Sequence, residues 1–126
     1  KDIMKYIIKK SEWLRGQKGK SDSYLLRSAD NLKCCLGFVG EQCGLSIQEL
    51  KDVGRPNTDS FNERCFPDWK KAGSWPAWFF DDDGYRSNDV NQLILINDND
   101  HLLDEGRSIL LNDIFNKHGD ELEFVE

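Results

Sequence analysis

The sequence predicts a single α+β domain over residues 1–126, mainly helical, with about four helices, a two- or three-stranded antiparallel sheet and a long irregular loop. Three observations predict this class. Amphipathic helical patterns recur along the chain, short alternating runs predict strands, and residues 54–88 have no period while carrying all three prolines. A chain of 126 residues suits one domain that buries a core without cross-links.

Helical spacing of apolar side chains marks several segments. The last predicted helix begins at Ser108 and ends before Gly119. The short helix predicted over residues 47–52 has a capping box at Ser46 and Glu49. A further segment, Asp89 to Ile96, suits a helix or a buried strand, and we favour a helix. The other predicted helices cover residues 3–14, Cys34 to Cys43, 47–52, and Ser108 to His118.

Two short segments are predicted to be strands. Residues 23–27 are one of them, and the alternating tail from Leu122 to Glu126 is the other. We expect the tail to pair with residues 23–27 in the antiparallel sheet.

The loop at 54–88 holds the strongest candidate for a binding site. A loop of this length is uncommon in a compact domain and is often functional. Tryptophan is enriched in interface hot spots, and an acidic rim suits a basic partner surface. Alternatively, the aromatic side chains anchor the loop to the core. The candidate binding residues are Trp75, Trp78, Phe79, Asp81, Asp82 and Asp83.

Charge and composition exclude several classes of function. Residues 1–33 hold nine Lys and Arg against four Asp and Glu, whereas residues 34–126 hold eight against nineteen, which returns the net charge of −6. Such an acidic chain argues against direct nucleic-acid binding, which requires basic side chains to neutralise phosphates. No apolar run reaches the roughly 18 residues of a membrane span. With no signal peptide and no disulfide framework in its four cysteines, we expect a cytoplasmic protein that binds no membrane.

Cysteine chemistry is the main enzymatic alternative. Cys34 or Cys35 at a helix N-terminus, with His101 or His118 as the base, would form a catalytic pair. The alternative is that these cysteines are buried structural residues. The chain has no Cys-x-x-Cys pair, so no metal and no cofactor are expected.

Several short motifs resemble an uncharacterised family of small phage and prophage proteins. They are Trp13-Leu14-Arg15-Gly16, Leu26-Arg27, Cys34-Cys35-Leu36-Gly37, and the stretch from Leu93 to Asp98 followed by a helix opened by Ser108. The resemblance implies a small α+β or mainly helical protein in a phage setting, with residues 54–88 variable and no known activity.

The predicted function is therefore non-enzymatic. We expect a phage- or prophage-encoded protein that binds a host protein in the host cytoplasm, through residues 54–88 and the acidic C-terminal half. Two alternatives stay open, an acidic mimic of nucleic acid and a small cysteine-dependent enzyme.

Overall fold

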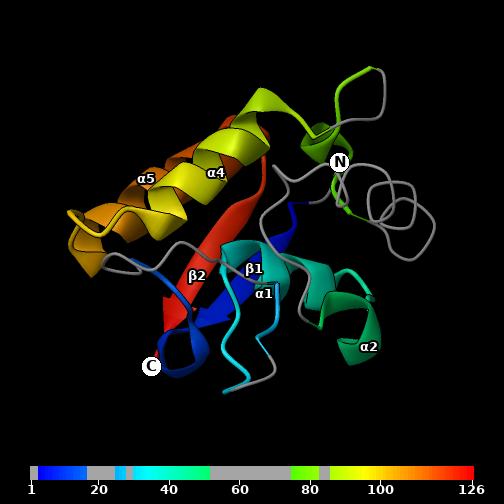
Figure 1. Ribbon diagram of the computed structural model, residues 1–126. Helices are drawn as coiled ribbons and strands as arrows, with labels where there is room; N and C mark the ends of the chain where they lie inside the picture. The colour runs from blue at the N-terminus through cyan, green and yellow to red at the C-terminus, as the bar shows by residue number, and fades with distance from the viewer. Residues whose placement is uncertain (1–2, 17–24, 28–29, 52–74, 83–85) are drawn as a thin grey trace.

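The computed structural model describes residues 3–16, 25–27, 30–51, 75–82 and 86–126 (Figure 1). The elements are β1 Lys5–Lys9, the 3-10 helix η1 Lys10–Glu12, α1 Cys35–Gln42, α2 Ile47–Leu50, the 3-10 helix η3 Ala77–Phe79, α4 Asn88–Asp98, α5 Asp104–Lys117 and β2 Glu121–Val125. α1 packs against β1, α5 packs against β2, and α4 contacts α1 and α5.

The N-terminal segment is a strand, so the helix predicted over residues 3–14 is wrong. β1 has the sequence Lys-Tyr-Ile-Ile-Lys, in which Tyr6 and Ile8 are buried while Lys5 and Lys9 are exposed. This alternation has the period of two that a strand requires. The adjacent pair Ile7 and Ile8 fits either period in the sequence, and β-branched residues favour strands.

The two strands run parallel, which also makes the predicted antiparallel sheet wrong. Lys5 pairs with Glu121 and Lys9 with Val125 in a two-stranded sheet. The tail strand is where the alternation predicts it, but its partner is β1. Leu26, from the segment predicted to pair with it, forms an isolated bridge with Lys51. Residues 23 and 24 lie outside the described part of the chain.

The predicted number of about four helices also differs from the structure. Within the described residues, three α-helices have two or more turns, α1, α4 and α5, and α2 is a single turn. The mixed α+β class is retained, but the helices pack with a parallel strand pair.

Both outer edges of the small sheet are closed by amide side chains. On the free edge of β1, the Ile7 N–H donates to Gln42 Oε1 at 2.8 Å, and Gln42 Nε2 donates to the Ile7 carbonyl at 2.6 Å. On the free edge of β2, the Leu122 N–H donates to Asn112 Oδ1 at 2.8 Å. Gln42 lies in α1 and Asn112 in α5, so the flanking helices take the hydrogen-bonding place of further strands.

α1 is the central helix, and it confirms the helix predicted from Cys34 to Cys43. Cys34 is its N-cap, and Cys35 is wholly buried. Gly37 is required by close packing, because a Cβ there would lie 1.8 Å from the Leu25 carbonyl oxygen. Gly40 similarly makes room for the Trp75 ring, at 2.7 Å.

α4 confirms the helix favoured for residues 89–96. Its N-cap is Ser87, whose hydroxyl accepts from the Val90 N–H at 3.3 Å. α5 begins at Asp104 and not at the predicted Ser108, whose hydroxyl instead donates to the Asp104 carbonyl at 2.7 Å. Two acidic side chains in its first turn favour this earlier start, because they complement the helix dipole.

The loop predicted over residues 54–88 is described only from residue 75, excluding residues 83–85. Its η3 turn inserts Phe79 into the core, where Phe79 contacts Trp75, Trp78 and Phe115. No helix in the described part of the chain is long and apolar enough to cross a membrane.

Candidate functional site

α4 and α5 contact each other and form a helical hairpin. At the end where α4 passes into α5, a buried asparagine makes several hydrogen bonds. Asn97 is 1% exposed and lies in the last turn of α4. Its Oδ1 accepts from Trp13 Nε1 at 2.8 Å and from the Cys35 N–H at 3.1 Å, and its Nδ2 donates to the Leu14 carbonyl at 2.9 Å. One side chain thereby joins α4, the N-terminus of α1 and the segment after η1.

A buried arginine stabilises the connection between the two helices. Arg107 is 2% exposed, and it donates to the carbonyls of Ile96, Asn99 and Leu102. These carbonyls belong to the last turn of α4 and to the connection, so Arg107 donates to backbone groups at and just beyond the end of the helix. Burial lowers the pKa of Arg107, which stays charged at neutral pH.

Asp104 joins this arginine to a second one. Arg15 binds the Asp104 carboxylate with two hydrogen bonds of 3.1 and 2.7 Å, and Arg107 contacts it at 3.1 Å. The hydrogen bonds from Arg15 hold the pKa of Asp104 below its ordinary value of 3.8, with further lowering by the charges of both arginines. The ion cluster fixes the start of α5 against the N-terminal segment.

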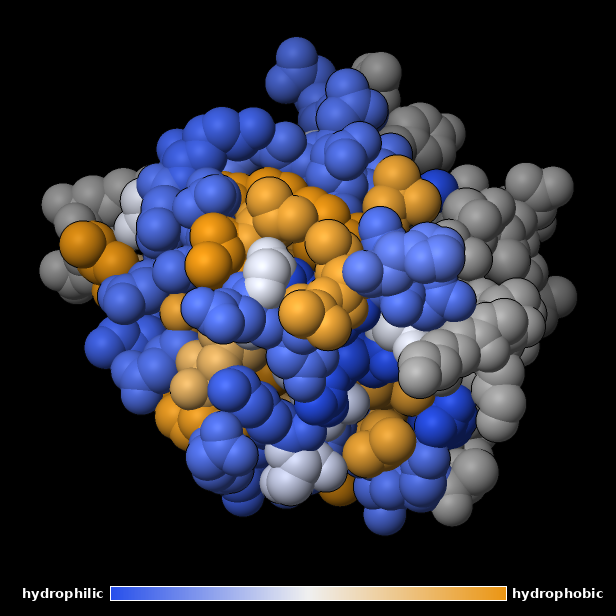
Figure 2. Space-filling model, turned by 90° about the vertical axis from the view of Figure 1, so that its left-hand side faces the viewer, coloured by the Kyte–Doolittle hydropathy of each residue, from blue (hydrophilic) through white to orange (hydrophobic). Residues whose placement is uncertain are grey.

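The outer side of the same hairpin exposes several apolar side chains among its polar ones. Figure 2, which views the molecule from the left of Figure 1, shows hydrophobic side chains gathered on this face and bordered by polar ones. An exposed leucine or isoleucine is unremarkable alone, but several on adjacent turns are typical of a contact surface. The exposed apolar residues of the hairpin are Leu95 at 55%, Leu103 at 82%, Ile109 at 56% and Leu110 at 41%.

Uncompensated acidic side chains flank these residues. Glu105 and Asp113 lie one turn before and one turn after Ile109, and both are exposed. Neither forms an ion pair with any described residue. Residues 86–126 hold ten acidic side chains against three basic ones, so this part of the chain is acidic.

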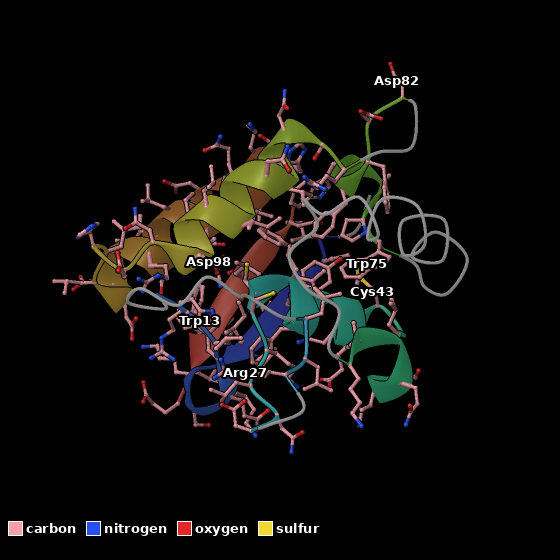
Figure 3. The ribbon with its side chains drawn as sticks, in the orientation of Figure 1. Trp13, Arg27, Cys43, Trp75, Asp82 and Asp98 are labelled. Atoms are coloured by element: carbon pink, nitrogen blue, oxygen red, sulfur yellow. The ribbon has the colours of Figure 1, made fainter. Side chains whose placement is uncertain are left out.

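The aromatic residues predicted to bind a partner lie at very different depths. Trp75 and Phe79 are buried, and Figure 3 shows Trp75 directed toward the body of the molecule. Trp78 is half-buried, where its Nε1 donates to Asp120 at 2.9 Å. The buried pair therefore serves as core in this structure, which is the alternative that the sequence left open.

The acidic residues predicted beside them remain at the surface. Asp81 and Asp82 are exposed, and Figure 3 shows Asp82 pointing away from the molecule. Asp83 lies outside the described residues. A contact between these carboxylates and a basic partner stays a prediction.

The candidate catalytic cysteines are part of the core. Cys34 and Cys35 are buried, and burial raises the pKa of the Cys35 thiol well above its ordinary value. A raised pKa keeps the thiol protonated, which opposes nucleophilic attack.

The candidate histidines lie elsewhere. The side chain of His101 is 93% exposed in the α4–α5 connection. His118 Nε2 lies 2.6 Å from Asp89, and its ring stacks on Trp78 at 4.1 Å between centroids. Within the described residues, no group of three or more His, Cys, Asp or Glu side chains could hold a metal ion.

Comparisons with known proteins found no relative of this chain. No protein-family model matches the chain, and no match was found among curated proteins or among solved structures.

Sequence reasoning missed the exposed side of the hairpin. The helix predicted from Ser108 leaves out Leu103 and Gly106. Because α5 begins at Asp104 with Leu103 as its N-cap, the spacing of these two residues from Leu110 is the signal that could have revealed the surface.

Proposed function

We propose that this chain is a non-enzymatic binding protein, phage- or prophage-encoded, that acts on a host protein through the outer side of α4 and α5. One observation carries the proposal, namely the exposure of Leu95 on α4 and of Leu103, Ile109 and Leu110 at α5. Burying them against a partner would remove apolar surface from water, the main driving force of protein association.

An acidic mimic of nucleic acid is the second candidate, and the excess of acidic over basic side chains in residues 86–126 favours it. The exposed leucines favour a protein-binding surface instead, because a mimic presents carboxylates to a basic groove. A cysteine-dependent enzyme has less support, since Cys35 is wholly buried.

The test is a pull-down from a bacterial host lysate with the double variant Leu103→Ser, Leu110→Gln. We expect this double variant no longer to capture the host protein that the wild type captures. Both leucines are exposed, so replacing them with polar side chains removes apolar contact surface and leaves the core intact. The matched control is Ile3→Ser, Ile47→Gln, which changes two exposed isoleucines away from the hairpin.

The control should retain the captured protein. If both double variants capture it as well as the wild type does, the outer side of α4 and α5 is not the binding surface. If only the control loses it, the surface lies near the N-terminus and α2.

A further inference from the structure

Two residues at the start of α5 disfavour the helix that they belong to. Leu103 is its N-cap and makes no capping hydrogen bond, although serine, threonine, aspartate or asparagine there would satisfy a free N–H. Gly106 follows within the first turn, where glycine is less favourable than alanine. The helix would be more stable with other residues at both positions.

Nothing inside the molecule requires the glycine. Gly106 does not have the positive φ that only glycine adopts readily. A Cβ built at Gly106 meets no atom within 4 Å, unlike one at Gly37. The space beside Gly106 is therefore open at the surface.

The open space lies between two exposed leucines. Leu103, Gly106 and Leu110 are spaced i, i+3 and i+7, which puts them on one stripe of the helix. Leu103 is 82% exposed and Leu110 41% exposed, so the stripe consists of two exposed leucines with a glycine between them. We call these three residues the Gly106 notch.

The charges beside the notch indicate what it would bind. Glu105 and Asp113 are exposed beside it and have no ion-pair partner among the described residues. A second copy of the chain would bring the same carboxylates together, which costs free energy. A partner with lysine or arginine around an apolar stripe would pair with them.

We propose that the Gly106 notch receives a basic amphipathic helix of a partner protein. A helix fits because its side chains pack into the groove between residues three and four apart, and a glycine lets the two backbones approach closely. This inference rests on the proposed function and names the class of partner for the same surface.

The test uses a synthetic amphipathic helical peptide of leucine, alanine and lysine, and a second peptide with glutamate in place of lysine. Binding is measured by fluorescence anisotropy at low and high salt. We expect the lysine peptide to bind, the glutamate peptide not to bind, and salt to weaken the complex.

The decisive variant is Gly106→Gln, which fills the notch with a side chain that favours helices. We expect it to weaken binding of the lysine peptide at least tenfold while the melting temperature stays equal or rises. Ile47→Gln is the matched control, because it places the same side chain at an exposed position on α2, and it should bind as the wild type does.

Four outcomes overturn the inference, and each is distinct. If Leu103→Ser, Leu110→Gln abolishes binding while Gly106→Gln does not, the surface binds but the notch does not, so only the proposed function survives. If neither variant changes binding, the lysine peptide binds elsewhere on the molecule. If the lysine peptide does not bind, a basic helix is not the partner. If the protein sediments as a dimer that Gly106→Gln dissociates, the notch binds a second copy.

Discussion

Where α4 passes into α5, the inner side of the helix pair buries two polar side chains and the outer side exposes several apolar ones. On the inner side, Asn97 and Arg107 are almost wholly buried. On the outer side, Leu103 and Ile109 are mostly exposed. A surface helix pair normally buries its apolar stripe and exposes its polar one.

The difference teaches that the two sides have different roles. The inner polar groups are held by hydrogen bonds to backbone atoms of three separate segments, so they fix how those segments meet. A buried polar group is costly unless it is paired in this way. The outer leucines contribute little to the isolated fold, which leaves them available for a partner.

Asn97→Leu, on the inner side, should have the largest effect on the free energy of unfolding. Leucine has a similar volume but leaves the Trp13 N–H, the Cys35 N–H and the Leu14 carbonyl without their partner in the core. Because each unpaired buried group costs about 1–3 kcal/mol, we expect the free energy of unfolding to fall by about 3 kcal/mol or more. Urea denaturation measures it.

The control for Asn97→Leu is Asn116→Leu, which changes an exposed asparagine of α5. It should alter the free energy of unfolding by less than about 0.5 kcal/mol. Equal losses in the two variants would contradict the central role of Asn97.

A smaller effect should appear in acid, at the ion cluster of Arg15, Asp104 and Arg107. The pKa of Asp104 is lower in the folded protein than its ordinary 3.8, so its stabilising contribution is complete above that pH and is lost as the pH falls through the folded pKa. Asp104→Asn should remove this part of the acid sensitivity. The side chain is 44% exposed and screened by water, so we expect about 1 kcal/mol or less at neutral pH.

Urea denaturation between pH 2 and pH 7 checks this prediction. Asp113→Asn is the control, because that exposed carboxylate has no ion pair among the described residues. The prediction fails if Asp104→Asn and wild type lose stability in parallel as the pH falls.

The smallest effect, and one of opposite sign, is expected on the outer side. Leu103→Ser supplies a capping hydroxyl at the N-cap of α5 and removes an exposed leucine. We expect the free energy of unfolding to rise by about 0.5–1 kcal/mol. Leu111→Ala, at a wholly buried position of the same helix, should lower it by about 2–5 kcal/mol. A clear loss of stability in Leu103→Ser would mean that the outer leucine belongs to the fold.

Local patterns predicted α1, α4 and the position of the tail strand, but they predicted a helix where β1 lies. α1 and α4 were predictable because Cys35 and Val39, and Val90 and Leu93, keep helical spacing. β1 was not, since five residues with Ile7 beside Ile8 satisfy both periods. Only the pairing with β2 decides between them, and that pairing joins opposite ends of the sequence.

The candidate site was less predictable for a related reason. Asn97 follows the apolar spacing of α4, so its burial could be anticipated, but its partners lie 62 to 84 residues away along the chain. The exposed leucines look like any core leucine in the sequence. Their exposure depends on which face of α5 packs against the rest of the fold, and Leu103 and Gly106 lie before the start that the sequence predicts at Ser108.

The parallel pairing of β1 with β2 has a consequence for how the chain folds. β1 comprises residues 5–9, and its only strand partner among the described residues is Glu121–Val125. Contacts between residues so distant in sequence close a large loop, which slows folding. During synthesis Tyr6 and Ile8 have no strand partner until the ribosome has made residues 121–125. The Asn112 amide can bond Leu122 only after that moment, so the interval before it is when the nascent chain is most open to misassociation.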